Sequence, residues 1–237
     1  MVELPEKAMI EKLKKIDTPT ITNVVATYQN SLQLYDAWYG EWYTDTSLKC
    51  MYPDYGPRVG YAATVVYALE TMRIKGLDRW ALPDHLDATK KPTILVAKQD
   101  FPPEIKNKVG LFGGIMTTRF KAQGVEGVIS DGPMRDLEEI REIGGVQYLV
   151  TGLTPGHGDF VARDVGVPVT VAGMTVMPGD MIHMDVNGAC KFPAKYLAEV
   201  VRRCEAHLKE EETTKARFGP DWSLQKWKAE VARQERK

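Results

Sequence analysis

The chain has 237 residues, 43% of them hydrophobic and 27% charged, a composition ordinary for a globular protein that can bury a substantial core. Lysine and arginine number 31 and aspartate and glutamate 32, so the net charge of −1 gives no reason to expect nucleic acid as a partner. There is no apolar run of about 18 residues that would predict a membrane span, and the amino terminus does not resemble a signal peptide. These features predict a cytoplasmic protein that binds no membrane.

Cysteine usage points in the same direction. Cys50, Cys190 and Cys204 form no Cys-x-x-Cys pair, so the sequence does not favour a zinc ribbon. A sparse, odd set of thiols is more typical of a reducing compartment than of a disulfide scaffold.

Two helices are predicted at the amino-terminal end. Residues 5–16 place Met9, Ile10, Leu13 and Ile16 on one face of an amphipathic helix. The polar residues 17–20 then end this helix and cap a second one, because short polar side chains accept hydrogen bonds from the free amides of a first turn.

Residues 35–55 are unusually aromatic and show neither helical nor strand periodicity. The segment contains Tyr35, Trp38, Tyr39, Trp42, Tyr43, Tyr52 and Tyr55. We interpret it as a long aromatic loop, for which two roles remain open. It acts as a lid that stacks on a ring-bearing substrate, or it serves packing and subunit contacts.

The remaining chain alternates strands and helices and then becomes rich in strands. Strands are predicted at residues 59–70, 93–97, 125–130, 147–150, 167–171 and 181–184, and helices at 111–123, 137–143, 194–210 and 221–236. This order predicts an α/β fold with a mixed sheet. Without repeats or a linker, we expect a single domain over residues 1–237, with a core at about 15–195 and a helical extension at 196–237.

The segment most suggestive of chemistry follows the predicted strand at 125–130. Asp131-Gly132 turns the chain, and Arg135-Asp136 then opens a helix. Charged groups between a strand's end and a helix's first turn lie where ligands commonly bind in α/β folds. Arg135 offers a bidentate donor for a carboxylate, and Asp136 a hard oxygen ligand for Mg²⁺ or Mn²⁺.

Several spaced motifs resemble the RraA-like family, which includes class II pyruvate aldolases. They are Val59-Gly60-Tyr61-Ala62-Ala63-Thr64, Gly113-Gly114-Ile115-Met116, Gly124-Val125-Glu126-Gly127-Val128, Asp131-Gly132, Arg135-Asp136, Gly166-Val167-Pro168-Val169, Gly173, Val176, and Pro178-Gly179-Asp180 with His183, Asp185 and Asn187-Gly188. The resemblance implies a fold related to swivelling β/β/α domains. It also implies a homotrimer or homohexamer, with active sites between subunits.

The same resemblance implies a metal-dependent lyase that acts on a small 2-oxo acid or hydroxy acid, by retro-aldol cleavage or by decarboxylation through an enolate. Arg135 and Asp136 would be catalytic. Arg135 would also bind the substrate carboxylate with the Gly113–Met116 segment, including the amides of Ile115 and Met116, and Asp136 would hold Mg²⁺ or Mn²⁺. An anion at this position suits the free amides of a helix amino terminus.

One position departs from the aldolase pattern. Where those aldolases carry an acidic residue, this chain has Gly114, which has no side chain for acid–base chemistry. Three possibilities follow: another carboxylate takes over, the substrate differs, or catalysis is lost. The alternative functions are therefore a non-catalytic regulator that binds a protein partner, as the family's namesake does, and a different lyase or hydratase with an aromatic substrate.

Other polar residues carry weaker expectations. His157 lies in a glycine-rich loop that could face the site, and His183 is near Asp185 in sequence. Asp185 and Asp131 are expected to shape turns, and Asp131 could also orient Arg135. Glu199 and Glu205 are candidates for an acidic residue that a neighbouring subunit would contribute.

Overall fold

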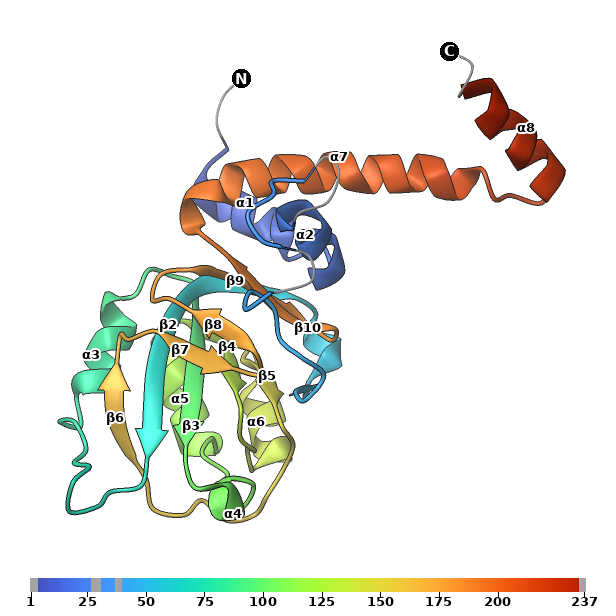
Figure 1. Ribbon diagram of the computed structural model, residues 1–237. Helices are drawn as coiled ribbons and strands as arrows, with labels where there is room; N and C mark the ends of the chain where they lie inside the picture. The colour runs from blue at the N-terminus through green and yellow to red at the C-terminus, as the bar shows by residue number, and fades with distance from the viewer. Residues whose placement is uncertain (1–3, 27–30, 37–39, 235–237) are drawn as a thin grey trace.

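A mixed eight-stranded sheet forms the centre of the molecule in the computed structural model, which describes residues 4–26, 31–36 and 40–234 (Figure 1). Its strands are β1 (Lys49–Cys50), β2 (Arg58–Ala68), β3 (Thr93–Asp100), β4 (Val125–Ser130), β5 (Gln147–Val150), β6 (Val161–Val165), β9 (Met181–Asp185) and β10 (Gly188–Phe192). The order is β1-β5-β4-β3-β2-β9-β10, and β6 pairs with the carboxyl end of β2. Strands β2 to β5 are parallel. Strands β1, β6 and β9 pair antiparallel to them, and β10 pairs antiparallel to β9.

Helices cover one face of this sheet and a small hairpin covers the other, while the last helix lies away from the sheet (Figure 1). The helices are α1 (Glu6–Leu13), α2 (Thr18–Val25), α3 (Ala81–Ala88), α4 (Pro103–Lys106), α5 (Gly114–Ala122), α6 (Leu137–Ile143), α7 (Leu197–Ala216) and α8 (Leu224–Gln234), with short 3₁₀ turns at Pro53–Tyr55 and Ala194–Tyr196. The hairpin consists of β7 (Val169–Val171) and β8 (Met174–Val176).

Strand β2 shows why the central strands read as continuous apolar runs. Successive side chains of a strand point to opposite faces, so Ala63 and Val65 join the core beneath α3, α5 and α6, while Ala62 and Val66 join the core beneath the β7–β8 hairpin. Both faces are buried, and neither needs polar residues.

A third apolar cluster holds the amino-terminal helices. Leu13 of α1 and Ile21 of α2 pack with Val200 of α7 and with residues of β9 and β10. Asp17 caps α2 by accepting a hydrogen bond from the Thr20 amide at 3.1 Å, as predicted from the polar residues 17–20. Helix α7 runs beyond the body of the molecule, and α8 lies at its far end (Figure 1).

The sequence located the elements around the proposed site well. The bounds of β4, α6 and β5 coincide with the predicted ranges. Predictions missed α3, α4, β1, β6, β8 and β10, and the strand predicted at 93–97 extends to Asp100 as β3.

The aromatic loop is largely irregular, as predicted, but Trp42 and Tyr52 lie inside the molecule, whereas Tyr43 is exposed. Trp42 is only 3% exposed, stacks on Tyr35 with 5.3 Å between ring centroids, and donates from Nε1 to the Asp36 carbonyl oxygen at 3.0 Å. Tyr52 is fully buried, and its hydroxyl donates to the Leu137 carbonyl oxygen at 2.8 Å, which ties the loop to the first turn of α6. These contacts favour packing over a lid; Trp38 and Tyr39 lie outside the described residues.

Candidate functional site

The predicted site residues meet where α5 and α6 begin, near the carboxyl end of β4. The Arg135 amide donates to the Phe112 carbonyl oxygen at 2.9 Å, and the Met134 amide donates to that of Gly152 at 2.9 Å. The first bond holds the segment between β4 and α6 against the loop that leads into α5, and the second holds it against the residues that follow β5. Arg135 and Asp136 therefore lie beside Gly113 and Gly114, as the resemblance implied.

Asp136 has an unusual backbone conformation that turns its side chain toward α5. Its φ of 60° and ψ of 42° lie in the left-handed region, which costs most L-residues roughly 1–2 kcal/mol and aspartate less. The side chain does not cap its own helix; Oδ2 instead accepts a hydrogen bond from the Gly114 amide at 3.2 Å. Strained conformations of this kind concentrate at functional sites, where surrounding contacts maintain them.

Gly113 is required by the close approach of these two charged side chains. A Cβ on Gly113 would lie 2.4 Å from Asp136 Oδ2 and 3.1 Å from Arg135 Nε. Its φ of −133° is open to any residue, so the reason for glycine is space. Without that space Asp136 could not reach the amino terminus of α5.

Arg135 retains donors for a ligand. Its Nε lies 3.6 Å from Asp136 Oδ2, and its side chain is 35% exposed. Within the described ranges, no protein acceptor engages its terminal guanidinium nitrogens. A guanidinium held at one end and free at the other can bind a carboxylate in bidentate geometry.

The first turn of α5 supplies further donors beside Arg135. The Gly114 amide is used by Asp136, but the amides of Ile115 and Met116 have no acceptor among the residues that the structure describes. Unpaired amides at a helix start attract anions. The structure thus places the predicted carboxylate-binding groups in one arrangement, while their roles remain predictions.

A cavity of about 420 Å³ joins these groups, and it contains a residue that the sequence analysis did not single out. It is lined by Leu111, Gly113, Ile115, Met116, Arg135, Asp136, Glu139, His157 and Phe160. Glu139 lies one helical turn after Asp136, and a Cβ on Gly114 would lie only 2.0 Å from Glu139 Oε1. A pattern search could have found it, because residues three apart share a helix face.

Most other candidates have structural partners. The buried His183 ring contacts the Thr18 hydroxyl at 2.9 Å and the Leu13 carbonyl oxygen at 3.1 Å. Asp185 accepts hydrogen bonds from the amides of Thr18 and Asn187, which confirms its role in a turn. Both residues therefore join α1 and α2 to β9, away from Arg135.

Asp131 is occupied by other cations. Its carboxylate pairs with Lys98 at 2.6 Å and Lys106 at 2.7 Å, and it accepts from the Gln99 amide at 2.8 Å. Within the described residues, no hydrogen bond or ion pair joins Asp131 to Arg135, so the expectation that it orients Arg135 has no support.

The acidic candidates on α7 also form ion pairs. Glu199 binds Arg202 and Arg203, which lower the pKa of its carboxyl to about 2, and Glu205 binds Lys12 at 2.5 Å. Neither lines the Arg135 cavity.

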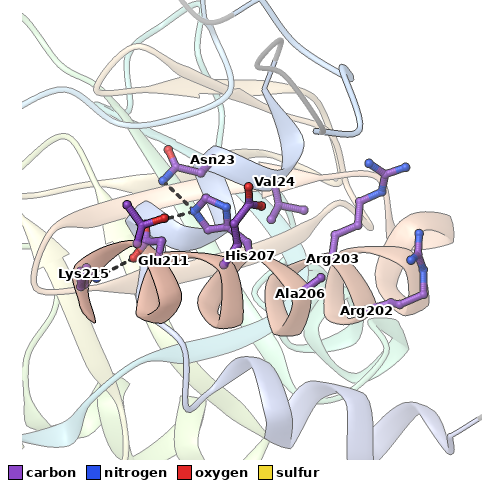
Figure 2. A pocket seen from close by; sticks show the side chains of 10 residues that line it. Asn23, Val24, Arg202, Arg203, Ala206, His207, Glu211 and Lys215 are labelled. Atoms are coloured by element: carbon purple, nitrogen blue, oxygen red, sulfur yellow. Dashed lines mark hydrogen bonds and ion pairs between the residues drawn. The ribbon is translucent and has the colours of Figure 1, made fainter. Parts of the chain in front are cut away.

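A larger cavity, about 740 Å³, lies between α2 and α7 (Figure 2). Its polar groups largely satisfy one another: the His207 ring lies 3.4 Å from Asn23 Nδ2 and 3.1 Å from Glu211 Oε1, and Lys215 binds Glu211 at 2.7 Å. We therefore place the candidate site at Arg135, where the donors lack partners.

Comparison with known proteins agrees with this placement of motifs. The RraA-like (Aldolase/RraA) family model matches residues 31–190. The chain belongs to the RraA-like family. An RraA-like solved structure, Streptomyces coelicolor RraAS2, described as an unusual member of the RNase ES inhibitor RraA protein family, superposes with a TM-score of 0.68 at 21% identity, over 91% of this chain and 99% of that one. At that identity the likeness shows the fold: a mixed α/β RraA-like architecture, as predicted.

Curated relatives match over shorter stretches. A 4-hydroxy-4-methyl-2-oxoglutarate aldolase of Thermus thermophilus is 31% identical over 87 residues, which is 36% of this chain and 52% of the relative. An uncharacterised protein of Methanocaldococcus jannaschii is 30% identical over 110 residues, 46% of this chain and 52% of the relative. The chain thus spans about half the length of these two relatives.

The donor set at the RraA-like site is compatible with a hard divalent cation. In the described parts of the chain, no cluster of three or more histidine, cysteine, aspartate or glutamate side chains could enclose a metal ion. Mg²⁺ commonly needs less, because it keeps several waters and binds through one or two carboxylates plus substrate oxygens. Asp136 provides one such carboxylate at the cavity, which fits that coordination and not a closed zinc site.

The described residues contain no helix long and apolar enough to cross a membrane.

Proposed function

We propose that this RraA-like protein is a divalent-metal-dependent carbon–carbon lyase that cleaves or decarboxylates a small 2-oxo acid through a pyruvate enolate. The observation that carries this proposal is the convergence in one cavity of the Arg135 guanidinium, the unpaired amides of Ile115 and Met116, and the Asp136 carboxylate. Relatives named as aldolases support the same reaction class.

The cationic and amide donors suit the carboxylate of a 2-oxo acid. Arg135 would bind that carboxylate with its free guanidinium nitrogens, and the α5 amides would bind a second oxygen. Such donors also stabilise negative charge that moves onto the 2-oxo oxygen as the carbon–carbon bond breaks, because a partly enclosed site strengthens electrostatic interactions.

Asp136 would hold the metal, Mg²⁺ or Mn²⁺, directly or through water. When bound, such an ion acts as a Lewis acid toward the enolate oxygen. The chain's part is to fix the Asp136 carboxylate, which it does through the Gly114 amide and the left-handed backbone.

The oligomer is part of the proposal. We infer a homotrimer or homohexamer in which a neighbouring subunit completes the cavity, since the Arg135 site is open on this subunit. The mass in solution, measured by light scattering, tests this; a monomer that is fully active contradicts it.

Pyruvate release tests the activity. The protein is supplied with oxaloacetate or with 4-hydroxy-4-methyl-2-oxoglutarate, with Mg²⁺, with Mn²⁺ and with a chelator. We expect metal-dependent release that falls by about 100-fold or more in Arg135→Ala, as for loss of a preorganised charge-stabilising donor. Arg119→Ala is the matched control, because Arg119 is an exposed arginine on α5 that does not line the cavity.

Oxaloacetate also decarboxylates without enzyme, and free metal ions contribute to this background. Pyruvate release is therefore measured with heat-denatured protein under the same conditions and subtracted. Release that is equal in the wild-type chain and Arg135→Ala contradicts the proposed function. Absence of release from both compounds, together with specific capture of a protein partner, would favour the regulator alternative instead.

A further inference from the structure

The geometry points to Glu139 as the proton-accepting group of the Arg135 cavity, positioned there because residue 114 has no side chain. This inference rests on the proposed function and names a residue that the reaction needs. Cleavage of a 4-hydroxy-2-oxo acid requires a base for the hydroxyl proton, and Arg135 cannot serve because arginine stays protonated.

Glu139 occupies the space that a side chain at position 114 would fill. The three atoms nearest to a Cβ built on Gly114 are all from Glu139: Oε1 at 2.0 Å, Cδ at 2.2 Å and Oε2 at 2.7 Å. The carboxylate of α6 therefore lies directly over the first turn of α5. Gly114 is buried beneath it and has a helical conformation that does not require glycine.

The position of Glu139 follows from the way α6 begins. Asp136 is the residue before the first turn, and Glu139 follows three positions later, so both carboxylates lie on the side of α6 that faces α5. Tyr52 fixes this turn through its hydrogen bond to the Leu137 carbonyl oxygen. Acidic residues are favourable in a helix's first turn, because the free amides there carry partial positive charge.

Among the described residues, no stabilising polar interaction accounts for the position of the Glu139 carboxylate. In the described segments it forms no ion pair and no hydrogen bond, whereas its neighbours Glu138 and Arg141 lie 4.0 Å apart. It is exposed and lines the cavity. His157, a histidine at the same cavity, contacts the Gly158 carbonyl oxygen through Nδ1, so its proton acceptor would be Nε2.

In the forward reaction the Glu139 carboxylate takes the proton of the C4 hydroxyl. The O–H electron pair forms the new carbonyl bond of the departing fragment, and the C3–C4 bond breaks. Its electron pair becomes the enolate of pyruvate, and protonated Glu139 returns the proton to C3. The Glu139 carboxylate is thus restored at the end of each turnover, and no other reactant is consumed.

Three variants test the assignment. Glu139→Gln keeps the shape and removes the proton acceptor, so pyruvate release and exchange of the pyruvate methyl protons in deuterium oxide should both fall by about 100-fold or more, the usual contribution of a general base. Glu142→Gln is the matched control, an exposed glutamate on the same helix outside the cavity. In the Glu139→Ala background, Gly114→Asp should recover at least about tenfold of the loss by returning a carboxylate to the same place.

Binding and folding measurements separate this role from others. Mn²⁺ affinity, followed by electron paramagnetic resonance, and thermal unfolding should be nearly unchanged in Glu139→Gln. If the variant loses Mn²⁺ together with activity, Glu139 is a metal ligand and the assignment is overturned. It is also overturned if Glu139→Gln matches Glu142→Gln, or if only His157→Gln abolishes proton exchange. A wild-type chain that neither releases pyruvate nor exchanges its protons refutes the proposed function itself.

Discussion

Replacing Gly114 with alanine separates activity from stability at the candidate site. The new methyl group would lie 2.0 Å from Glu139 Oε1, so the carboxylate must leave its place. Moving the Glu139 carboxylate should cost little free energy, because it is exposed and forms no hydrogen bond or ion pair among the described residues. Gly114 lies in helix α5 without a positive φ, and a compatible glycine-to-alanine change stabilises by about 0.4–1 kcal/mol through the unfolded chain.

We therefore expect Gly114→Ala to unfold at the same or slightly higher urea concentration while pyruvate release falls. The loss should approach that of Glu139→Gln, about 100-fold if the carboxylate is fully displaced. The double variant Gly114→Ala/Glu139→Gln should be no worse than Glu139→Gln alone, because both changes act through one group and their effects do not add.

Two outcomes would refute this reasoning. A Gly114→Ala protein with wild-type turnover means that the position of Glu139 over α5 is irrelevant to the chemistry. A protein that unfolds more readily by more than about 1 kcal/mol means that the methyl group meets packed backbone and not a movable side chain.

Three further predictions concern other parts of the molecule. Asp136→Asn keeps a residue that tolerates the left-handed conformation and can still accept a hydrogen bond from the Gly114 amide. The free energy of unfolding should therefore be unchanged, while the affinity for Mn²⁺ falls. An unchanged Mn²⁺ affinity in electron paramagnetic resonance would exclude Asp136 as a metal ligand. Trp42→Ala should lower the free energy of unfolding in urea by about 3–5 kcal/mol, since it leaves a cavity in the packed interior. A change in turnover with unchanged stability would instead support the lid hypothesis. Burial lowers the pKa of His183 below 6.5, so the neutral ring is favoured by folding, and the stability it contributes is present above pH 6.5 and declines as the pH falls below it. The free energy of unfolding should accordingly drop between pH 7 and pH 5, and a His183 ring that protonates at pH 6.5 in NMR titration would contradict this.

Local patterns were sufficient for the elements around the site. The apolar run at 125–130, the following Asp-Gly turn and the charged helix from Leu137 to Ile143 each carry their own signal, and the structure agrees with all three. Elements without such signals were missed. Helix α3 lies in a segment that contains Pro83. Strands β8 and β10 are the second strands of two antiparallel pairs, and their extended conformation depends on pairing with β7 and β9.

By itself, the sequence determined the fold class, the family and the pairing of Arg135 and Asp136 with the start of the Gly113–Gly114 helix. It also identified Gly114 as a missing carboxylate. Only the tertiary structure showed what fills that gap, because Glu139 and Gly114 belong to different helices and meet through the packing of α5 against α6. The tertiary structure likewise showed that Trp42 and Tyr52 pack in the interior, since residue type alone does not distinguish a buried ring from one that binds a ligand.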